Sequence, residues 1–222
     1  AVDWRPMKSP YPIVGVVAVG CAFLVGLQLA GNLAPAAVAK FIASSAFITL
    51  AVQQGALDSV YGRLILTGLG FSWCGDLLLV GHSQDFFLAG LVAFLLAHVA
   101  YSAAFLRHGF GRVALIGTAI VIGVIAMLVW GWLGPLTPAE LSVPVRAYIT
   151  VISLMVIFAY GTRGIGGSWL IPVGASLFFL SDLSVAALRL AETDYPTYAL
   201  GLPAYYAAQV CLALSVSQSR SH

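Results

Sequence analysis

The chain has 222 residues, of which 61% are hydrophobic and only 8% are charged. A soluble domain carries about a quarter charged residues, so this chain has too few to cover a water-exposed surface. The net charge of +2 gives no basic footprint for a nucleic acid, and the three cysteines show no zinc or disulfide spacing. Composition therefore predicts a polytopic membrane protein and excludes a disordered chain, a disulfide-stapled secreted domain and a nucleic-acid-binding protein.

Eight apolar runs follow one another along the chain, separated by short breaks rich in glycine, proline and asparagine. A bilayer core requires about 20 apolar residues per helix, and each run meets that length. We therefore predict an all-α fold, a single integral membrane domain over residues 1–222 with eight transmembrane helices. The predicted spans are 12–30, 34–53, 62–81, 85–106, 112–133, 143–161, 168–190 and 197–217.

Lysine and arginine are distributed unequally between the two ends of these spans, and an even number of spans puts both chain termini on one side. The termini side carries Arg5, Lys8, Arg63, Arg107, Arg112, Arg163 and Arg220, and the other side carries Arg146 and Arg189. Cytoplasmic loops hold the excess of Lys and Arg. We therefore expect both termini in the cytoplasm, with the inner membrane as the location if the source is a bacterium.

Three charged residues fall at membrane depth: Lys40, Asp76 and Asp182. Each costs about 2.5–3.5 kcal/mol at a helix centre, which favours a functional use. Counting about 1.5 Å per residue from the span ends puts all three at similar heights, in the half of the bilayer away from the termini. A structural explanation is also open, in which Lys40 and one aspartate form a buried pair that fixes helix packing.

The two aspartates have matching surroundings. Residues 71–77 and 177–183 share a pattern of aromatic, small residue, Asp and Leu, and each segment precedes a span with a polar stripe. The stripes are His98, Tyr101 and Ser102 in one span and Tyr205, Tyr206 and Gln209 in the other. We infer two similarly oriented four-helix halves. The small residue before each aspartate, Gly75 or Ser181, would let a neighbouring helix approach closely.

Two buried carboxyl groups can divide acid and base work between them. Burial favours the neutral form of a carboxyl group, whereas a nearby lysine favours the ionised form. An ionised and a protonated aspartate in one cavity suit hydrolysis through a cationic intermediate. Because the cavity opens inside a bilayer, its substrate is lipid-like. His98 has no second His or Cys at i+3 or i+4, so a metal site has weak support.

Two other classes of membrane protein use intramembrane aspartates. An intramembrane aspartyl protease typically has Tyr-Asp and Gly-x-Gly-Asp motifs, but Trp73 and Ser181 stand where Gly and Tyr would be needed. A proton-coupled transporter of small molecules or lipids would also combine repeats with membrane Asp and Lys, and it is the alternative from another class. Helices interrupted by paired Gly and Pro would favour a transporter, and none is evident in the spans of Asp76 and Asp182.

An ordered set of short motifs resembles the YhhN-type lysoplasmalogenase family over residues 40–210. The set comprises Lys40, Ser72 to Asp76, Phe87, Gly90, His98, Tyr101, Arg146 to Tyr148, Met155, Gly174-Ala175, Phe179, Ser181-Asp182, Tyr206 and Gln209. Lys40 is followed by Phe41 where the family is expected to have proline, which concerns local helix shape more than chemistry.

The resemblance implies an eight-helix membrane hydrolase that cleaves the vinyl ether bond of lysoplasmalogens, without metal or cofactor. The products would be a fatty aldehyde and glycerophosphocholine or glycerophosphoethanolamine. Asp76 and Asp182 would be catalytic, and the sequence does not say which is the acid. The expected substrate-binding residues are Lys40, His98, Tyr101, Tyr148, Tyr206 and Gln209. Phe71, Trp73, Phe178 and Phe179 would line the site of the alkenyl chain.

Overall fold

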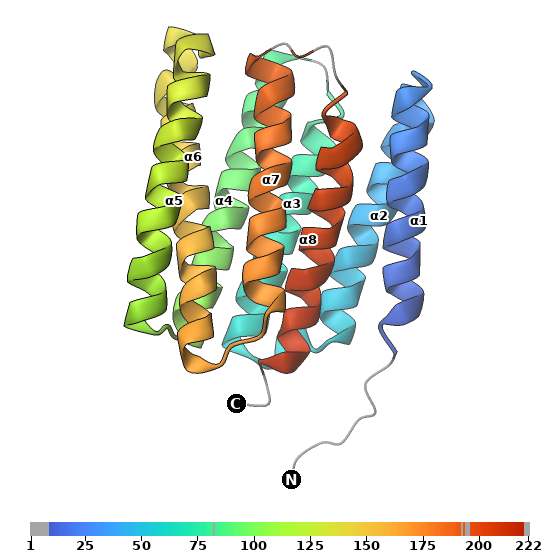
Figure 1. The fold of residues 1–222 in the computed structure, drawn as a ribbon. Coiled ribbons are helices and arrows are strands. Elements are labelled where there is room, and N and C mark those ends of the chain that lie inside the picture. Colours follow the sequence, from blue (N-terminus) through green and yellow to red (C-terminus); the bar gives the residue numbers. More distant parts are fainter. Residues whose placement is uncertain (1–8, 82, 192, 194–195, 220–222) are drawn as a thin grey trace.

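The computed structural model describes residues 9–81, 83–191, 193 and 196–219 and shows eight α-helices running up and down in one bundle (Figure 1). The helices are α1 (Tyr11–Leu29), α2 (Leu33–Gln53), α3 (Val60–Leu78), α4 (Gln84–His108), α5 (Arg112–Leu133), α6 (Ser142–Gly161), α7 (Leu170–Leu190) and α8 (Tyr198–Gln218). No strand occurs among the described residues. The all-α prediction with eight helices is confirmed, and each helix end lies within three residues of its predicted position.

Seven of the eight helices in the described chain are long and apolar enough to cross a membrane. The exception is α3, which carries Arg63, Asp76 and four glycines and is therefore less apolar. It nevertheless packs against α2, α4 and α8, inside the bundle rather than on its surface. A helix surrounded by other helices needs less lipid-facing apolar surface, so we keep α3 as the eighth span.

The helix neighbours repeat between the two halves of the chain. In the first half α1 packs on α2 and α3 on α4, and in the second half α5 packs on α6 and α7 on α8. Across the halves, α8 packs on α2 as α4 packs on α6. The first helix pair of each half, α1–α2 and α5–α6, lies at an outer edge of the bundle, and the two edges are opposite each other (Figure 1). This arrangement supports two similarly oriented four-helix halves.

The ends of α3 and α4 are set by local capping. The side chain of Ser59 accepts a hydrogen bond from the amide of Gly62 at 2.9 Å, and that of Ser83 accepts one from the amide of Phe86 at 3.3 Å. These N-caps satisfy amides that the helix itself leaves without a partner. Before α3, Gly55 adopts a φ of 79°, a left-handed conformation that favours glycine.

Two glycines of α3 let α4 approach closely. A Cβ at Gly68 would lie 2.3 Å from the ring of Tyr101, and one at Gly75 would lie 2.6 Å from the ring of Phe94. The aromatic rings of α4 therefore occupy space that a side chain on α3 would fill. The expectation that the small residue before Asp76 permits close approach is met by Gly75, and this contact fixes the height of Asp76 against α4.

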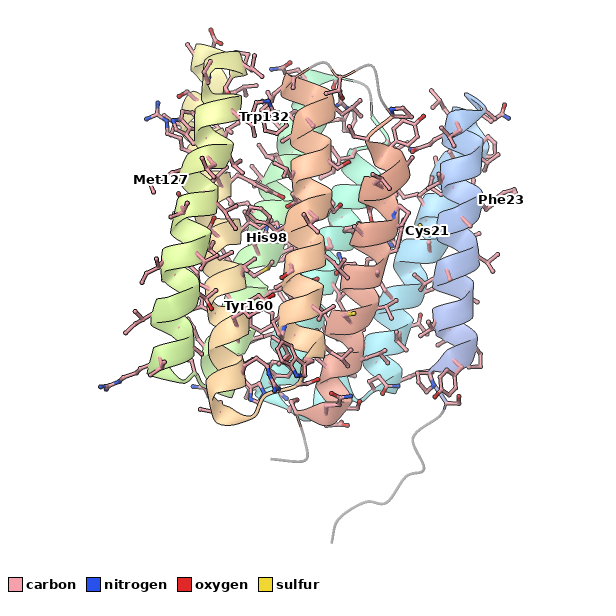
Figure 2. All side chains as sticks on the ribbon, viewed as in Figure 1. Cys21, Phe23, His98, Met127, Trp132 and Tyr160 are labelled. Carbon is pink, nitrogen blue, oxygen red and sulfur yellow. The ribbon has the colours of Figure 1, made fainter. Side chains whose placement is uncertain are left out.

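The outer surface of the bundle is apolar and its interior holds polar side chains. Phe23 on α1 and Met127 on α5 are 61% and 67% exposed and project away from the bundle, whereas His98 is fully buried inside it (Figure 2). Water would disfavour such exposed side chains, and lipid would accommodate them. The structure thus agrees with an integral membrane protein.

The arginines at the helix ends lie at the end of the bundle that the sequence predicts. Arg63, Arg107, Arg112 and Arg163 lie at the end where α2 meets α3, α4 meets α5 and α6 meets α7. The start of α1 and the end of α8 lie at that same end of the bundle (Figure 1). The predictions on Arg5, Lys8 and Arg220 concern residues outside the described ranges.

Candidate active site

Asp76 lies in a nearly closed polar cluster between α2, α3 and α8. Its side chain is 3% exposed, and its Oδ2 accepts hydrogen bonds from the hydroxyls of Ser44 and Tyr205, both at 2.6 Å. The Nζ of Lys40 lies 3.4 Å from its Oδ1. Two hydroxyl donors and an ammonium group all stabilise the ionised carboxylate.

The positions of these donors follow from helix geometry. Lys40 and Ser44 are one turn apart on α2, so both side chains face α3. Tyr206 lies behind Ser44, with its hydroxyl 3.2 Å from the Ser44 Oγ. The Asp76 cluster, which we define as Lys40, Ser44, Asp76 and Tyr205, is therefore supported from the side away from the carboxylate.

Asp182 has fewer donors than Asp76. The hydroxyl of Tyr148 on α6 donates to its Oδ2 at 2.7 Å, and Nε2 of His98 on α4 lies 3.3 Å from the same oxygen. The side chain of Asp182 is 16% exposed, and no cation of Lys or Arg pairs with it among the described residues. We name His98, Tyr148 and Asp182 the Asp182 cluster.

One aromatic side chain separates the two clusters. Phe178 is fully buried, and its ring centroid lies 4.7 Å from that of His98 and 5.4 Å from that of Tyr205. Both contacts are edge-on, a favoured arrangement of aromatic rings. Phe178 thus holds the side chains that touch the two carboxylates at a fixed spacing.

A cavity of about 160 Å³ is bordered by both aspartates. Lys40, Tyr148 and Tyr205 also line it, and the rest of its wall is mainly apolar side chains of α4, α5, α6, α7 and α8. A volume of roughly 10–15 Å³ is enough for one water, so the cavity has room for water and part of a lipid. The predicted common cavity is therefore present, as a mainly apolar chamber with both carboxylates in its wall.

The cavity extends towards the end of the bundle opposite the start of α1 and the end of α8. Residues near that end of several helices line it, including Leu133 of α5, Arg189 of α7 and Tyr198 of α8. Asp182 is two turns further inside α7 than Arg189. This agrees with the height expected from the sequence, in the half of the membrane away from the termini.

Four predicted substrate-binding residues, His98, Tyr101, Tyr206 and Gln209, are not among the described residues that line the cavity. His98 is fully buried beside Asp182. The hydroxyl of Tyr101 donates to Oε1 of Gln209 at 2.8 Å, and both side chains are fully buried. Tyr206 is 2% exposed and contacts Ser44. In this structure these four residues belong to the clusters or pack around them, and their contact with substrate stays a prediction.

The expected aromatic wall is only partly correct. Phe179 lines the cavity, but Phe71, Trp73 and Phe178 do not. The indole of Trp73 instead donates to Ser45 on α2 at 3.2 Å. Trp73 is three residues from Asp76 and thus points about 60° away from it around α3, which directs its ring towards α2.

Two residues that touch Asp76, Ser44 and Tyr205, are not among the site residues predicted from the sequence. Ser44 lies four residues after Lys40, a helical spacing that signals a common face. Tyr205 belongs to the polar stripe of α8, next to the selected Tyr206. The helical spacing and the polar stripe are both visible in the sequence, although neither shows which hydroxyl contacts the carboxylate.

No group of three or more His, Cys, Asp and Glu side chains able to hold a metal ion occurs within the described ranges. Whether the protein works without a metal or cofactor is a prediction for experiment. The side chains at hand for chemistry are the two carboxylates, with hydroxyl, ammonium and imidazole groups around them. Carboxyl groups in unequal surroundings are typical of paired acid and base catalysis.

The fold and the cavity together define a polytopic helical membrane protein with two carboxylates facing one intramembrane chamber. The sequence model of the YhhN family matches residues 35–216, and this chain belongs to that family. No solved structure gives a significant match to the chain.

Three curated relatives carry the name lysoplasmalogenase. The chain is 30% identical to lysoplasmalogenase TMEM86A of Bos taurus and 32% identical to that of Homo sapiens, each over 162 residues and 70% of this chain. It is 30% identical to lysoplasmalogenase TMEM86B of Sus scrofa over 191 residues, 83% of this chain and 78% of the relative. The matched region spans 66% of each TMEM86A protein, slightly less than two thirds of its length.

Proposed function

We propose that this protein hydrolyses the vinyl ether bond of lysoplasmalogens within the membrane. The observation that carries the proposal is the single cavity bordered by Asp76 and Asp182, whose donor sets differ. Relatives named lysoplasmalogenase support the substrate class. The products are a fatty aldehyde and glycerophosphocholine or glycerophosphoethanolamine.

The unequal surroundings of the two aspartates support different roles for them. Asp76 receives two hydroxyl donors and the Lys40 ammonium, which favour its anionic form. Asp182 has no such cation and lines a cavity with a mostly apolar wall, which favours its protonated form. Asp182 is therefore the general acid, and Asp76 is the anion that stabilises positive charge and accepts a proton.

The first chemical step is protonation of the alkene. Asp182 transfers its proton to the vinyl carbon remote from oxygen, which leaves an oxocarbenium ion and an Asp182 carboxylate. The anionic Asp76 lowers the energy of this cation by direct electrostatic attraction in a site of low dielectric constant. Tyr148 and His98 stabilise the Asp182 carboxylate that this step creates.

Water then completes the hydrolysis. A water molecule attacks the oxocarbenium carbon and gives its proton to Asp76, forming a hemiacetal. In the collapse, protonated Asp76 returns this proton to the ether oxygen, which leaves as the glycerol hydroxyl. The hemiacetal hydroxyl loses its proton to Asp182 as the aldehyde forms. Both aspartates regain their starting states, and one water is consumed per substrate.

The apolar wall of the cavity accommodates the hydrocarbon chain. Phe87, Phe94 and Phe179 contribute aromatic surface, and leucine, isoleucine and valine side chains contribute most of the remainder. Burial of each methylene is favourable by about 0.8 kcal/mol, so a long chain provides binding energy that a short soluble ether lacks. We further propose that both termini face the cytoplasm, on the Lys and Arg bias of the helix ends.

The transporter alternative requires helices that break near the site. The helices α3 and α7, which carry the two aspartates, are continuous over Val60–Leu78 and Leu170–Leu190. A proline does lie inside α8, at Pro203, one turn or less from Tyr205 and Tyr206. A single proline in one helix does not favour transport over hydrolysis.

The proposal is tested with purified protein in detergent. Lysoplasmalogen is compared with an ester-linked lysophospholipid that has the same headgroup and chain length, and aldehyde release is measured. We expect aldehyde from the vinyl ether substrate only, with loss of release on Asp182→Asn. Accumulation of an intact lipid or solute in sealed vesicles, without aldehyde, would instead support the transporter.

A further inference from the structure

Arg189 lies at the end of the cavity away from the Asp76 cluster. It is in the last turn of α7, and it lines the cavity together with Phe87 from the first turn of α4. Its guanidinium carbon is 5.0 Å from the centroid of the Phe87 ring. A guanidinium is attracted to an aromatic face, so Phe87 holds Arg189 against the cavity wall.

The position of Arg189 relative to Asp182 suits a glycerophospholipid. The two residues are seven positions apart on α7, which is about two turns and about 10 Å along the helix, on the same face. A lysoplasmalogen has three glycerol carbons between its vinyl ether oxygen and its phosphate ester oxygen. With the ether at Asp182, the phosphate therefore reaches the zone that the Arg189 side chain covers.

Lys40 and Arg189 are the cationic side chains among the described residues that line the cavity. The Lys40 side chain is 11% exposed and lies 3.4 Å from Oδ1 of Asp76, so its charge is directed at that carboxylate. Arg189 is exposed at the mouth, and its planar group can donate two parallel hydrogen bonds to a phosphate. The two cations thus serve different anions.

We propose that Arg189 binds the phosphate group of the lipid substrate and thereby sets the direction in which the lipid lies in the cavity. The inference rests on the proposed function, because it takes the lipid to be a lysoplasmalogen. The phosphate lies towards the end of the bundle opposite the chain termini, and the vinyl ether lies at the two carboxylates. The glycerophosphate product then leaves from the same end.

The kinetic test compares a phosphate-bearing and a phosphate-free substrate, lysoplasmalogen and 1-O-alkenylglycerol. Arg189→Gln should raise KM for lysoplasmalogen at least about tenfold, since a hydrogen-bonded charge is lost, and leave kcat nearly unchanged. It should leave KM for alkenylglycerol unchanged, and Arg189→Lys should recover part of the loss. The control is Arg163→Gln, because Arg163 also lies over an aromatic ring, Trp169, but at the other end of the bundle.

A binding test makes the result independent of catalysis. The probes are a lysophosphatidylcholine with an uncleavable alkyl ether and the corresponding alkylglycerol. Arg189→Gln should weaken binding of the phospholipid and not of the alkylglycerol. If the unmodified protein cleaves no vinyl ether but shows this difference, the proposed reaction fails and the phosphate site stands.

Three results would overturn the inference. Equal effects of Arg189→Gln on both lipids would show that Arg189 acts through structure alone. An unchanged phospholipid affinity, with Lys40→Met weakening it instead, would put the phosphate at Lys40. Displacement of the phospholipid by inorganic phosphate at a similar concentration would show a site for free anions rather than for a lipid headgroup.

Discussion

Lys40 and Asp76 form a buried ion pair between α2 and α3, with Nζ 3.4 Å from Oδ1 and side chains that are 11% and 3% exposed. Hydroxyl groups of Ser44 and Tyr205 occupy the other carboxylate oxygen at 2.6 Å. The pair is thus hydrogen-bonded as well as charged, which a buried pair needs to offset its desolvation. A packing role and a catalytic role both fit this geometry, and mutants separate them.

The first prediction concerns this ion pair. Lys40→Met leaves a carboxylate buried without its cation, and we expect the free energy of unfolding to fall by about 3–5 kcal/mol. Lys40→Met combined with Asp76→Asn removes both charges and should recover most of that stability. Thermal unfolding of equal amounts of each purified variant in one detergent measures the recovery.

Activity then distinguishes the two roles of the pair. The stable double variant should still be inactive, because the anion that stabilises the oxocarbenium ion is gone. A stable and active double variant would assign the pair to packing only.

The second prediction concerns the two aspartates as a unit. Asp76→Asn and Asp182→Asn should each lower turnover at least about 100-fold, since an amide cannot transfer the proton or carry the negative charge. The double variant should be little worse than either single one, because residues that act together are not additive. Asp182→Asn should unfold at a temperature close to that of the unmodified protein, because it leaves no cation of Lys or Arg unpaired. Near-normal aldehyde release by either single variant would eliminate the two-aspartate mechanism.

The third prediction concerns the hydroxyl that contacts Asp182. Tyr148→Phe removes the hydrogen bond of 2.7 Å to Oδ2 and should lower kcat about tenfold or more, because a bond to a developing charge is lost. Tyr160→Phe is the matched control, since Tyr160 is also on α6 but its hydroxyl is 3.2 Å from Ser176 and it does not line the cavity. Turnover measured under saturating substrate compares them. Similar losses in both variants would point to a general effect on α6 packing.

The fourth prediction concerns metal ions. Because the proposed acid, base and cation stabiliser are all side chains, turnover should be unchanged after incubation with EDTA and removal of the chelator by gel filtration. The assay is run alongside elemental analysis of the same sample. A loss of turnover that is restored by a single divalent ion would contradict the mechanism.

The fifth prediction concerns orientation in the membrane. Reporters active only in the cytoplasm should be active when fused after residue 222 and inactive when inserted between α5 and α6, at residues 137–138. The reason is the Lys and Arg excess at the end of the bundle that holds the termini. The opposite pattern of activity would reverse the proposed direction of the cavity and of product release.

The positions of the helices in this protein can be predicted from its sequence alone. Each span shows as a run of about 20 apolar residues, and turn residues mark each end, because length and hydrophobicity are local properties of the chain. The same reasoning identifies Lys40, Asp76 and Asp182, since a charge within an apolar run is conspicuous wherever the helix packs. The matching segments around the two aspartates also predict that the bundle consists of two four-helix halves.

The tertiary structure decides which partner each charge receives. Tyr205 and Tyr206 are adjacent in sequence, but adjacent residues point about 100° apart around a helix. Only the packing of α8 against α2 and α3 shows that Tyr205 reaches Asp76 while Tyr206 reaches Ser44. Likewise, only the packing of α4 turns Tyr101 to Gln209 and His98 to Asp182. Hydrophobicity along a chain gives the depth of a residue, whereas its partners depend on the rotation of each helix about its own axis, which side-chain packing between helices fixes.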